Sequence, residues 1–417
     1  MELIGATRKT KVHSLIDKVY HLTNLQRAWE RVKENDGAGG IDSVDIQQYG
    51  AALAENLGIL HEQLKTSAYR PMPVRRVQIP KRGNPGEMRQ LGIPTIQDRV
   101  CQQALKNRLE PIFDPTFHAC SFAYRPERSA HDAMRKIWWE IMEGNRWIVD
   151  ADLRDYFGSV NHDKLIDMVA EKISDGRVLA LIRQILKSGY KEKGVQYPTP
   201  SGTPQGGVIS PLLSNIYLTP FDNEMVARGY KLTRFADDWL VVCRTKAEAE
   251  QALKAAREIL HGLELEIHPT KTRITHISYG FEFLGYKVKQ GKGRKLPKEK
   301  LKTTTNPLNL YAIPKEQSVA RFKEQIRKHT RRRTPLTLKE VIDNINPIIR
   351  GWGNYFRKAH VRKLFNKLTG WIIHRLRSFI YRRWRNVGWK KHSEEVLYGK
   401  FGLVNLTQII PSIGGRS

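Results

Sequence analysis

The chain has 417 residues, of which 71 are Lys or Arg and 42 are Asp or Glu, giving a formal net charge of +29. This surplus indicates a polyanionic partner, most commonly nucleic acid. No apolar run approaches the roughly 18 residues of a membrane helix. The three cysteines stand singly, which excludes a disulfide scaffold and a four-cysteine zinc site. The polar N-terminus shows no signal peptide, so we expect a cytoplasmic protein. The length of the chain predicts two to four domains.

The first third of the chain predicts helices around one hairpin. Apolar residues recur at helical spacing in four segments. Residues 71–94 form two strand-like runs about a turn rich in Gly and Pro, which is typical of a β-hairpin. Ser129 and Asp132 have the spacing of a capping box. The expected helices cover residues 12–35, 43–64, 96–112 and 129–144.

The middle of the chain alternates strands with helices. The strands are short and apolar; one runs into Asp152, and two others are joined by Ala236, Asp237 and Asp238. This alternation favours an α+β layer, an antiparallel sheet with helices on one face. The expected strands cover residues 146–153, 231–235, 239–243 and 263–267, and the expected helices 162–189 and 246–261.

The composition changes near the C-terminus. Residues 287–302 are rich in Lys and indicate a basic linker, whereas residues 315–385 predict an Arg-rich helical region. The composition of the end of the chain predicts a small basic segment that binds DNA. Its cations are Arg375, Arg377, Arg382, Arg383, Arg385, Lys390 and Lys391.

Acidic side chains stand at the ends of apolar strands. Asp152 follows one strand, and Asp237 with Asp238 occupies a tight turn between two others. Adjacent carboxylates repel each other unless cations lie between them, and Mg²⁺ prefers a few carboxylates with substrate phosphate oxygens. Two such ions can activate a 3′-hydroxyl and stabilise a leaving pyrophosphate. An isolated Asp-Asp pair is more often a solvated turn, but the apolar flanks indicate that this one caps a buried hairpin.

Three blocks resemble those of reverse transcriptases. Residues 234–238, Arg-Phe-Ala-Asp-Asp, resemble the [YF]-x-D-D motif, and residues 151–157 are similar to the D-x-x-x-x-[FY] block. Residues 200–211 contain the Pro-Gln-Gly of a third block. Each block is weak to moderate alone, but their order and separation are specific. The resemblance implies a right-hand polymerase with fingers, palm and a helical thumb, which adds dNTPs to a DNA or RNA primer along an RNA template.

The resemblance also assigns roles to residues. It implies two Mg²⁺ ions, for which Mn²⁺ is a potential substitute. The expected catalytic residues are Asp152, Asp237, Asp238 and Lys271, and the expected metal site comprises Asp152, Leu153, Asp237 and Asp238. The expected nucleotide-binding residues are Lys81, Arg89, Arg75, Phe157, Gln205 and Gly206. The expected primer grip is Phe283, Leu284 and Gly285.

Several of these residues also have simpler interpretations. Phe157 would leave no room for a 2′-hydroxyl and so favour dNTPs, but an aromatic ring here could equally be core. Gly206 removes a side chain where backbone approaches a nucleotide, or belongs to an ordinary loop. Lys271 could protonate pyrophosphate, and a plain surface lysine is about as probable. Lys81 and Arg89 could bind phosphate or be solvated cations.

Two further segments narrow the resemblance. Residues 39–42 resemble the extra N-terminal block of non-retroviral enzymes, and residues 349–356, Ile-Arg-Gly-Trp-Gly-Asn-Tyr-Phe, resemble the maturase domain of group II intron proteins. Trp352 and Phe356 have the spacing of a helix core. The chain is most similar to the short bacterial class C proteins without an H-N-H endonuclease. The expected RNA-binding cations are Arg125, Arg128, Arg350, Arg357, Lys358 and Arg362.

This resemblance implies a domain order and a set of partners. We expect an N-terminal extension with fingers over 1–147, a palm over 148–299 with an insertion at about 162–199, a thumb or maturase domain over 300–370, and a DNA-binding segment over 371–417. The partners would be template, primer, dNTP, group II intron RNA and a DNA target, with no membrane, in the bacterial nucleoid. The protein would assist splicing and retrohoming. Alternatives are a domesticated enzyme of DNA repair or phage defence, and a splicing-only maturase.

Overall fold

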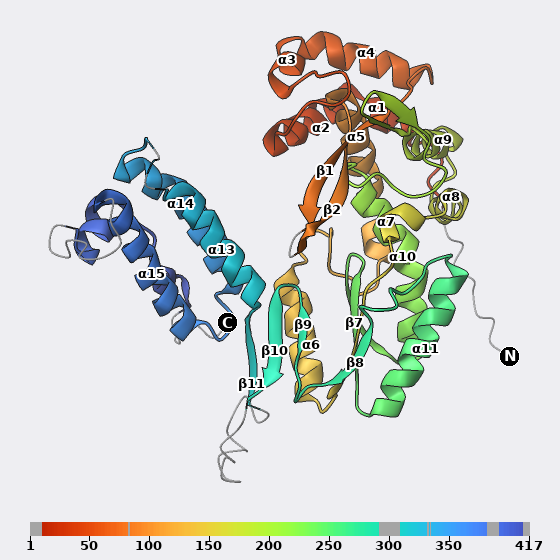
Figure 1. Cartoon of the computed structure of the whole chain (residues 1–417). Coiled ribbons are helices and arrows are strands. Elements are labelled where there is room, and N and C mark those ends of the chain that lie inside the picture. Colours follow the sequence, from red (N-terminus) through yellow and green to blue (C-terminus); the bar gives the residue numbers. More distant parts are fainter. Residues whose placement is uncertain are drawn as a thin grey trace. The chain divides into compact units, whose positions relative to one another are not determined.

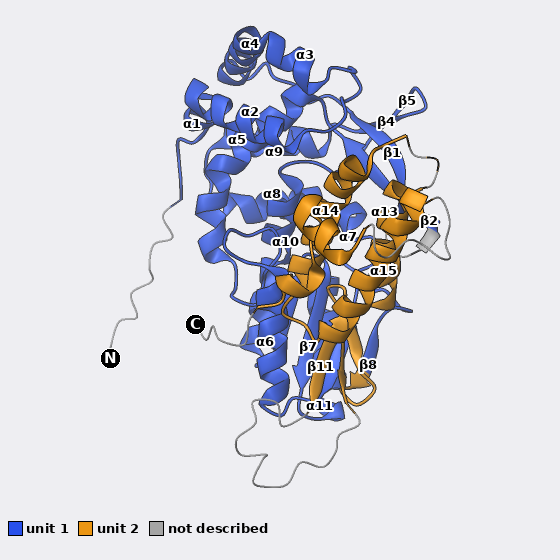
Figure 2. Cartoon of the chain, turned by 90° about the vertical axis from the view of Figure 1, so that its left-hand side faces the viewer, with its two compact units in different colours: residues 1–274 blue, residues 275–417 orange. Residues whose placement is uncertain are grey.

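The computed structural model describes residues 11–81, 84–291, 309–331, 333, 335–381 and 392–411. The chain divides into two compact units, Met1–Ile274 and Thr275–Ser417, coloured blue and orange in Figure 2. Within the described ranges, no helix is both long enough and apolar enough to span a membrane. The first unit holds the predicted extension and fingers with most of the predicted palm.

The four helices predicted in the first third of the chain are present, and the first two are each divided (Figure 1). The helices are α1 Ile16–Tyr20, α2 Leu22–Asn35, α3 Ile46–Ala51, α4 Leu53–Lys65, α5 Ile96–Phe113 and α6 Ala130–Met142. Ser129 caps α6 in the predicted box, with the Asp132 side chain bonding back to the backbone of Ser129. The apolar sides of α1, α2 and α4 pack on α5, which is buried along most of its length.

The predicted hairpin is part of a four-stranded fingers sheet. Its strands run in the order β2 Asn84–Ile93, β1 Val74–Lys81, β4 Tyr190–Glu192 and β5 Val195–Tyr197. Arg76 pairs with Gly92 across the antiparallel β1–β2 ladder, and β4 adds to β1 in parallel. The β4–β5 hairpin was not predicted, because three-residue strands show no clear alternation. Lys193 and Gly194, with φ of 48° and 88°, form its turn.

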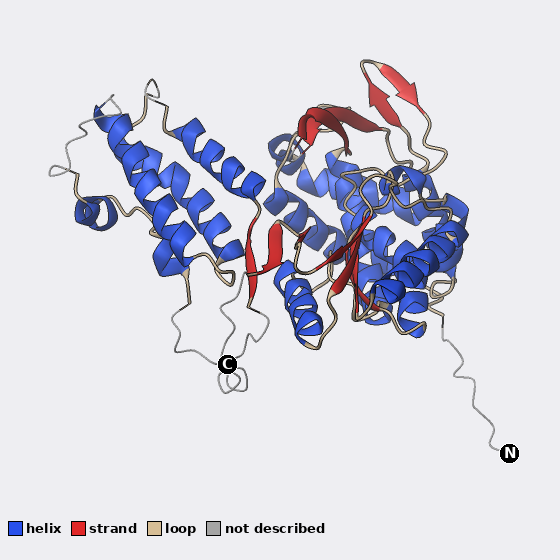
Figure 3. Cartoon of the chain, turned by 60° about the horizontal axis from the view of Figure 1, so that its bottom comes forward, coloured by secondary structure: helices blue, strands red, loops and turns tan. Residues whose placement is uncertain are grey.

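The palm is a second sheet, with helices packed on it (Figure 3). Its strands run in the order β6 Lys231–Phe235, β7 Asp238–Cys243, β3 Trp147–Ala151 and β8 Arg273–His276. β7 pairs antiparallel with both β6 and β3. The helices α6, α10 (Ser210–Ala227) and α11 (Lys246–Gly262) contact these strands. The sheet and helices match the predicted α+β layer.

Two of the predicted elements were wrong. The helix expected over 162–189 is α8 (His162–Ala170) and α9 (Gly176–Leu186), because Asp175 caps a new helix start. The strand expected over 263–267 does not form, apart from an isolated bridge at its last residue. Leu263 and Leu265 are buried, but Glu264 between them has a φ of 57°, which breaks an extended strand.

The second unit combines a small sheet with helices. Its strands run in the order β11 Leu310–Pro314, β10 Tyr286–Gln290 and β9 Phe281–Phe283. Its described helices are α13 Glu316–His329, α14 Leu338–Phe356 and α15 Arg362–Tyr381, followed by the short π-helix η2 Val396–Lys400 and the 3-10 helix η3 Leu406–Ile409. The expected linker over 287–302 is therefore partly strand β10, and its remainder from residue 292 lies outside the described residues.

Aromatic packing joins the helices of the second unit. Trp352 stacks on Phe322 of α13 at 4.6 Å between ring centroids, and Phe356 is buried. The prediction that Trp352 and Phe356 pack inward is confirmed. Arg377, expected to contact DNA, is instead buried and donates to the carbonyl of His392. The expected DNA-binding cations from 382 to 391 lie outside the described residues.

Candidate functional site

Three acidic residues lie at one end of the palm sheet. Ala151 pairs with Trp239 in the β3–β7 ladder, so the same register places Asp152 opposite Asp238. Asp237 occupies the turn between β6 and β7 beside them. Asp238 is exposed, whereas Asp152 and Asp237 are partly buried. The fold thus brings together acids that lie 85 residues apart in the sequence.

The charges around these acids act in opposite directions. Burial raises the pKa of Asp237 above its usual value, and the negative charge of Asp152 raises it further, whereas Arg89 and Lys271 lower it. Lys271 Nζ lies 2.8 Å from Oδ2 of Asp152. The four predicted catalytic residues are therefore neighbours in the structure.

The donor chemistry of this group suits a hard divalent cation. Asp152 and Asp237 bring carboxylate oxygens close enough that their repulsion shifts the pKa of Asp237, and a divalent cation relieves such repulsion. In the described part of the chain, no group of three or more His, Cys, Asp or Glu side chains is arranged to hold a metal ion, so the candidate ligands are the acids of this group together with substrate oxygens. Leu153, the fourth member of the predicted metal site, has a buried side chain and bridges to Ile267.

A buried arginine holds the turn that carries the acids. Arg234 and Asp222 have fully buried side chains, and the guanidinium Nε and Nη2 donate to the two carboxylate oxygens at 2.7 and 2.6 Å. Nη1 donates at 3.0 Å to the carbonyl of Ala236, a turn residue with a φ of 61°. Burial lowers the pKa of Arg234, but the charge of Asp222 and its hydrogen bonds raise it, with smaller contributions from Tyr156 and Cys120, so the net shift of the pKa is upward. No sequence pattern links Asp222 on α10 to Arg234 on β6, so sequence reasoning missed this pair.

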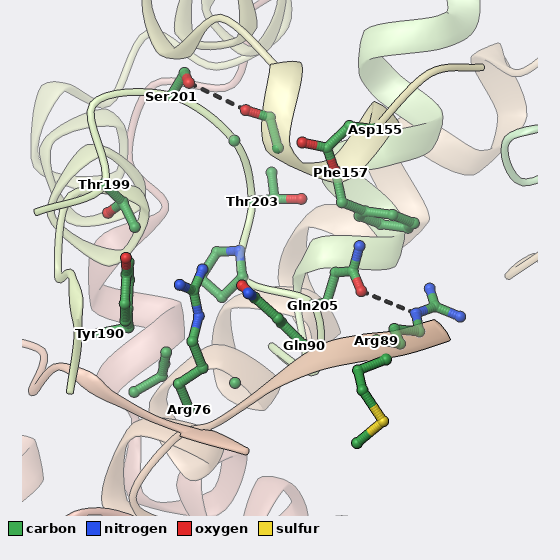
Figure 4. A pocket seen from close by; sticks show the side chains of 16 residues that line it. Arg76, Arg89, Gln90, Asp155, Phe157, Tyr190, Thr199, Ser201, Thr203 and Gln205 are labelled. Carbon is green, nitrogen blue, oxygen red and sulfur yellow. Dashed lines mark hydrogen bonds between the residues drawn. The ribbon is translucent and has the colours of Figure 1, made fainter. Parts of the chain in front are cut away.

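A cavity of about 380 Å³ lies between the β1–β2 hairpin and α7 (Tyr156–Ser159) (Figure 4). Three predicted nucleotide-binding residues, Arg89, Phe157 and Gln205, line it. Arg89 Nε donates to Gln205 Oε1 at 2.8 Å, which joins the fingers to the Pro-Gln-Gly loop. Phe157 is nearly buried, with 8% of its surface exposed at the cavity. The neighbouring Tyr156 is structural, because its hydroxyl donates to a carbonyl of α10.

The Pro-Gln-Gly loop packs against the fingers strand β2. The Gly92 amide donates to the carbonyl of Gln205 at 2.7 Å. A Cβ at Gly206, which has a φ of 116°, would collide with the carbonyl oxygen of Gly92. The absence of a side chain at Gly206 therefore lets the loop pack on β2, and its nucleotide-binding role stays a prediction.

Two other predicted nucleotide-binding cations belong to strand β1. Arg75 alternates with Arg76 along β1, and its Nε and Nη2 donate to the carbonyl of Gly39 at 3.1 and 2.8 Å. Arg75 thus holds the N-terminal glycine loop, and its nucleotide-binding role stays a prediction. Lys81 is the last residue of β1, and its side chain lies outside the described part of the structure.

One predicted RNA-binding cation is structural. The Arg125 side chain is 6% exposed, and its Nε donates to Asp114 at 2.7 Å. Its other nitrogens donate to the backbone carbonyls of His118, Ser121 and Asp114. The prediction for Arg125 was therefore wrong, since it lacks the exposed head a phosphate contact needs. Arg128 is exposed and bonds to one carbonyl.

The predicted primer grip is a tight turn in the second unit. Leu284 and Gly285 have positive φ of 47° and 79° between β9 and β10. Tyr355 of α14 donates its hydroxyl to the carbonyl of Leu284 at 2.7 Å, and Tyr286 donates to the carbonyl of Tyr355 at 2.5 Å. The predicted primer grip is therefore hydrogen-bonded to α14, the helix that contains the maturase-like residues 349–356. The four remaining RNA-binding candidates, Arg350, Arg357, Lys358 and Arg362, are exposed.

Two protein families match this chain. Residues 79–288 match the reverse transcriptase (RNA-dependent DNA polymerase) family, and residues 319–397 match the maturase-specific domain of group II introns. These domains bind nucleic acid, including intron RNA, and the polymerase family depends on divalent metal ions. The first match contains the palm acids and the Pro-Gln-Gly loop.

Individual relatives agree with these matches. The chain is 35% identical to protein YkfC of Escherichia coli (strain K12), over 61% of this chain and 77% of that protein. It is 30% identical to the group II intron-encoded protein LtrA of Lactococcus lactis subsp. cremoris, over 82% of this chain and 69% of LtrA. A solved partial Cas6-RT-Cas1–Cas2 complex matches with a TM-score of 0.40 and 22% identity, covering 63% of this chain and 45% of that one. The chain therefore belongs to the group II intron-encoded reverse transcriptases, RNA-directed DNA polymerases that also carry a maturase domain.

Proposed function

We propose that the protein uses Mg²⁺ held by Asp152, Asp237 and Asp238 to add dNTPs to a primer 3′-hydroxyl along an RNA template. The convergence of these acids at the end of the β3–β7 ladder carries the proposal. When bound, the divalent ions would activate the 3′-hydroxyl and stabilise charge on the leaving pyrophosphate. Asp152 is bonded to Lys271, so an ion that uses this carboxylate competes with the lysine ammonium. The lysine ammonium released in this way would then be able to donate a proton to the leaving group.

The cavity beside α7 supports the choice of substrate. Phe157 offers a nearly buried ring as a floor for the nucleotide sugar, and Arg89 on β2 supplies a cation that also lines the cavity. The bond from Arg89 to Gln205 fixes the orientation of this cation. A pre-positioned guanidinium can bind phosphate oxygens bidentately with little loss of conformational freedom.

Primer extension on a defined RNA template tests this function. The purified protein with Mg²⁺ and all four dNTPs should extend a DNA primer to the end of the template. Chelation by EDTA should stop extension, and added Mg²⁺ should restore it, because the acids alone cannot stabilise the developing charge. Extension that persists in excess chelator would contradict the proposal. Mn²⁺ in place of Mg²⁺ shows whether the site accepts the substitute ion.

Replacing Phe157 should weaken sugar selection. Phe157→Ala is expected to raise the use of rNTP relative to dNTP by about tenfold or more, since the pocket gains room for a 2′-hydroxyl. The ratio of kcat/KM for one rNTP and its dNTP measures this. Tyr156→Phe is the matched control, because it removes a hydroxyl bonded to Ser214 while keeping a buried ring. An unchanged ratio in Phe157→Ala would place the sugar gate elsewhere.

We also propose that the exposed cations of the second unit bind intron RNA during splicing and retrohoming. Arg350 and Arg357 lie on or just after α14, whose aromatic residues pack inward. Lys358 and Arg362 extend this basic surface to the start of α15. The maturase-domain match favours this role over a domesticated repair or defence enzyme, and the converging acids disfavour a splicing-only protein.

A further inference from the structure

We propose that the hydroxyl of Thr203 binds the 3′-hydroxyl of the incoming nucleotide and so selects substrates that can be extended. This inference rests on the proposed function, because it takes the sugar to lie on Phe157. Thr203 lines the same cavity as Phe157 and Gln205 (Figure 4). It adds a specificity-determining contact to the site, made by a residue outside the catalytic and nucleotide-binding groups predicted from the sequence.

The Thr203 hydroxyl is buried without a protein partner. The residue is 5% exposed, and among the residues that the structure describes its Oγ1 has no hydrogen-bond partner. A buried hydroxyl left unpaired costs about 1–3 kcal/mol, so a ligand that satisfies it gains affinity. A threonine hydroxyl can both donate and accept, and therefore suits a sugar hydroxyl.

The loop around Thr203 is fixed to the helix that carries Phe157. The Thr203 amide donates to the carbonyl of Phe157 at 2.7 Å, and the Gly202 amide donates to the carbonyl of Val160 at 2.8 Å. The ring of His162 bonds to the carbonyl of Gly202 at 2.7 Å. Gly202 has a φ of 88°, and a Cβ there would lie 2.6 Å from the Phe157 carbonyl oxygen. The backbone of Thr203 is therefore fixed relative to the helix that carries Phe157.

The chemistry of the sugar identifies the partner. A 2′-deoxynucleotide carries its triphosphate on C5′ and its base on C1′, and its 3′-hydroxyl is the one hydrogen-bond donor of the sugar ring. If the 2′ edge lies on Phe157, the neighbouring 3′-hydroxyl enters the same cavity. Ser201 also lines the cavity, but it is exposed and its hydroxyl already donates to the carbonyl of Gly158 at 3.0 Å. Thr203 thus offers the better-placed unpaired hydroxyl.

The preference for dATP over ddATP tests the inference, because ddATP lacks the 3′-hydroxyl. Thr203→Val keeps the side-chain shape and should reduce the ratio of kcat/KM for dATP to that for ddATP about fivefold, the worth of one hydrogen bond. Thr203→Ser keeps the hydroxyl and should retain the wild-type ratio. Ser201→Ala is the matched control and should also retain it. A wild-type ratio in Thr203→Val would overturn the inference.

If Thr203→Val extends primers too slowly for kinetics, nucleotide binding without catalysis provides a second measurement. Binding of dATP and ddATP to a complex on a dideoxy-terminated primer requires no chemistry. Thr203→Val should weaken dATP binding and leave ddATP binding unchanged, whereas equal weakening of both would show a structural role and overturn the inference. Failure of the wild-type protein to extend any primer would instead reject the proposed function, so the two failures are distinguishable.

Discussion

Asp237→Ala is expected to abolish primer extension while RNA binding and folding are retained. Asp237 lies at the sheet end with Asp152 and Asp238, where its partly buried carboxylate would hold metal ions. Loss of one group that stabilises transition-state charge costs roughly 10²–10³ in rate, and loss of a metal ligand should cost at least about that much. Single-turnover extension of a labelled primer measures the effect, with RNA binding measured separately on the same preparation.

Asp150→Ala provides the matched control. Asp150 precedes Asp152 by two residues on β3, and its carboxylate bonds to Arg273 at 2.9 Å. Asp150→Ala removes one negative charge from β3, the strand that leads into Asp152, and leaves the turn with Asp237 and Asp238 unchanged in sequence. Extension by this variant should stay near the wild-type rate. Wild-type extension by Asp237→Ala, or equal loss in both variants, would contradict the assignment of Asp237.

The periodicity of the sequence predicted most of the fold because apolar faces decide which elements form. The capping box at Ser129 and the glycine-rich loop over 36–40 set helix ends that the structure confirms. The prediction failed where one residue changes the backbone direction. Glu264, in the left-handed region, breaks the apolar run that predicted a strand, and the cap at Asp175 divides a helix.

The candidate site was predicted in part, because motif spacing identifies residues but not their contacts. The structure places Asp152 beside the acidic turn, as the blocks imply, and it adds a bond from Arg89 to Gln205 that the blocks did not predict. It also shows that Gly206 accommodates β2, since short-range sequence cannot reveal which backbone approaches a glycine. Buried partners drawn from distant elements, such as Asp222 for Arg234, leave no periodic signal.

Asp222→Ala is expected to lower the free energy of unfolding by about 3–5 kcal/mol, because it leaves the Arg234 guanidinium buried without its carboxylate. Both side chains are fully buried and joined by two hydrogen bonds of 2.6 and 2.7 Å. Chemical denaturation followed by tryptophan fluorescence measures the loss, and the buried Trp239 on the adjacent strand contributes to that signal. Glu224→Ala is the surface control, because its partner Arg228 is solvent-accessible and such pairs contribute about 1 kcal/mol or less.

The double variant Asp222→Leu with Arg234→Met separates stability from catalysis. Replacing a buried ion pair with apolar residues is often neutral or stabilising, so most of the lost stability should return. The double variant still lacks the bond from Arg234 to the carbonyl of Ala236, which holds the turn before Asp237. Primer extension should therefore remain below the wild-type rate, by about tenfold or more if Arg234 positions the acids as an outer-shell group. A stable double variant that extends primers at the wild-type rate would show that the pair stabilises the fold and does not position the turn.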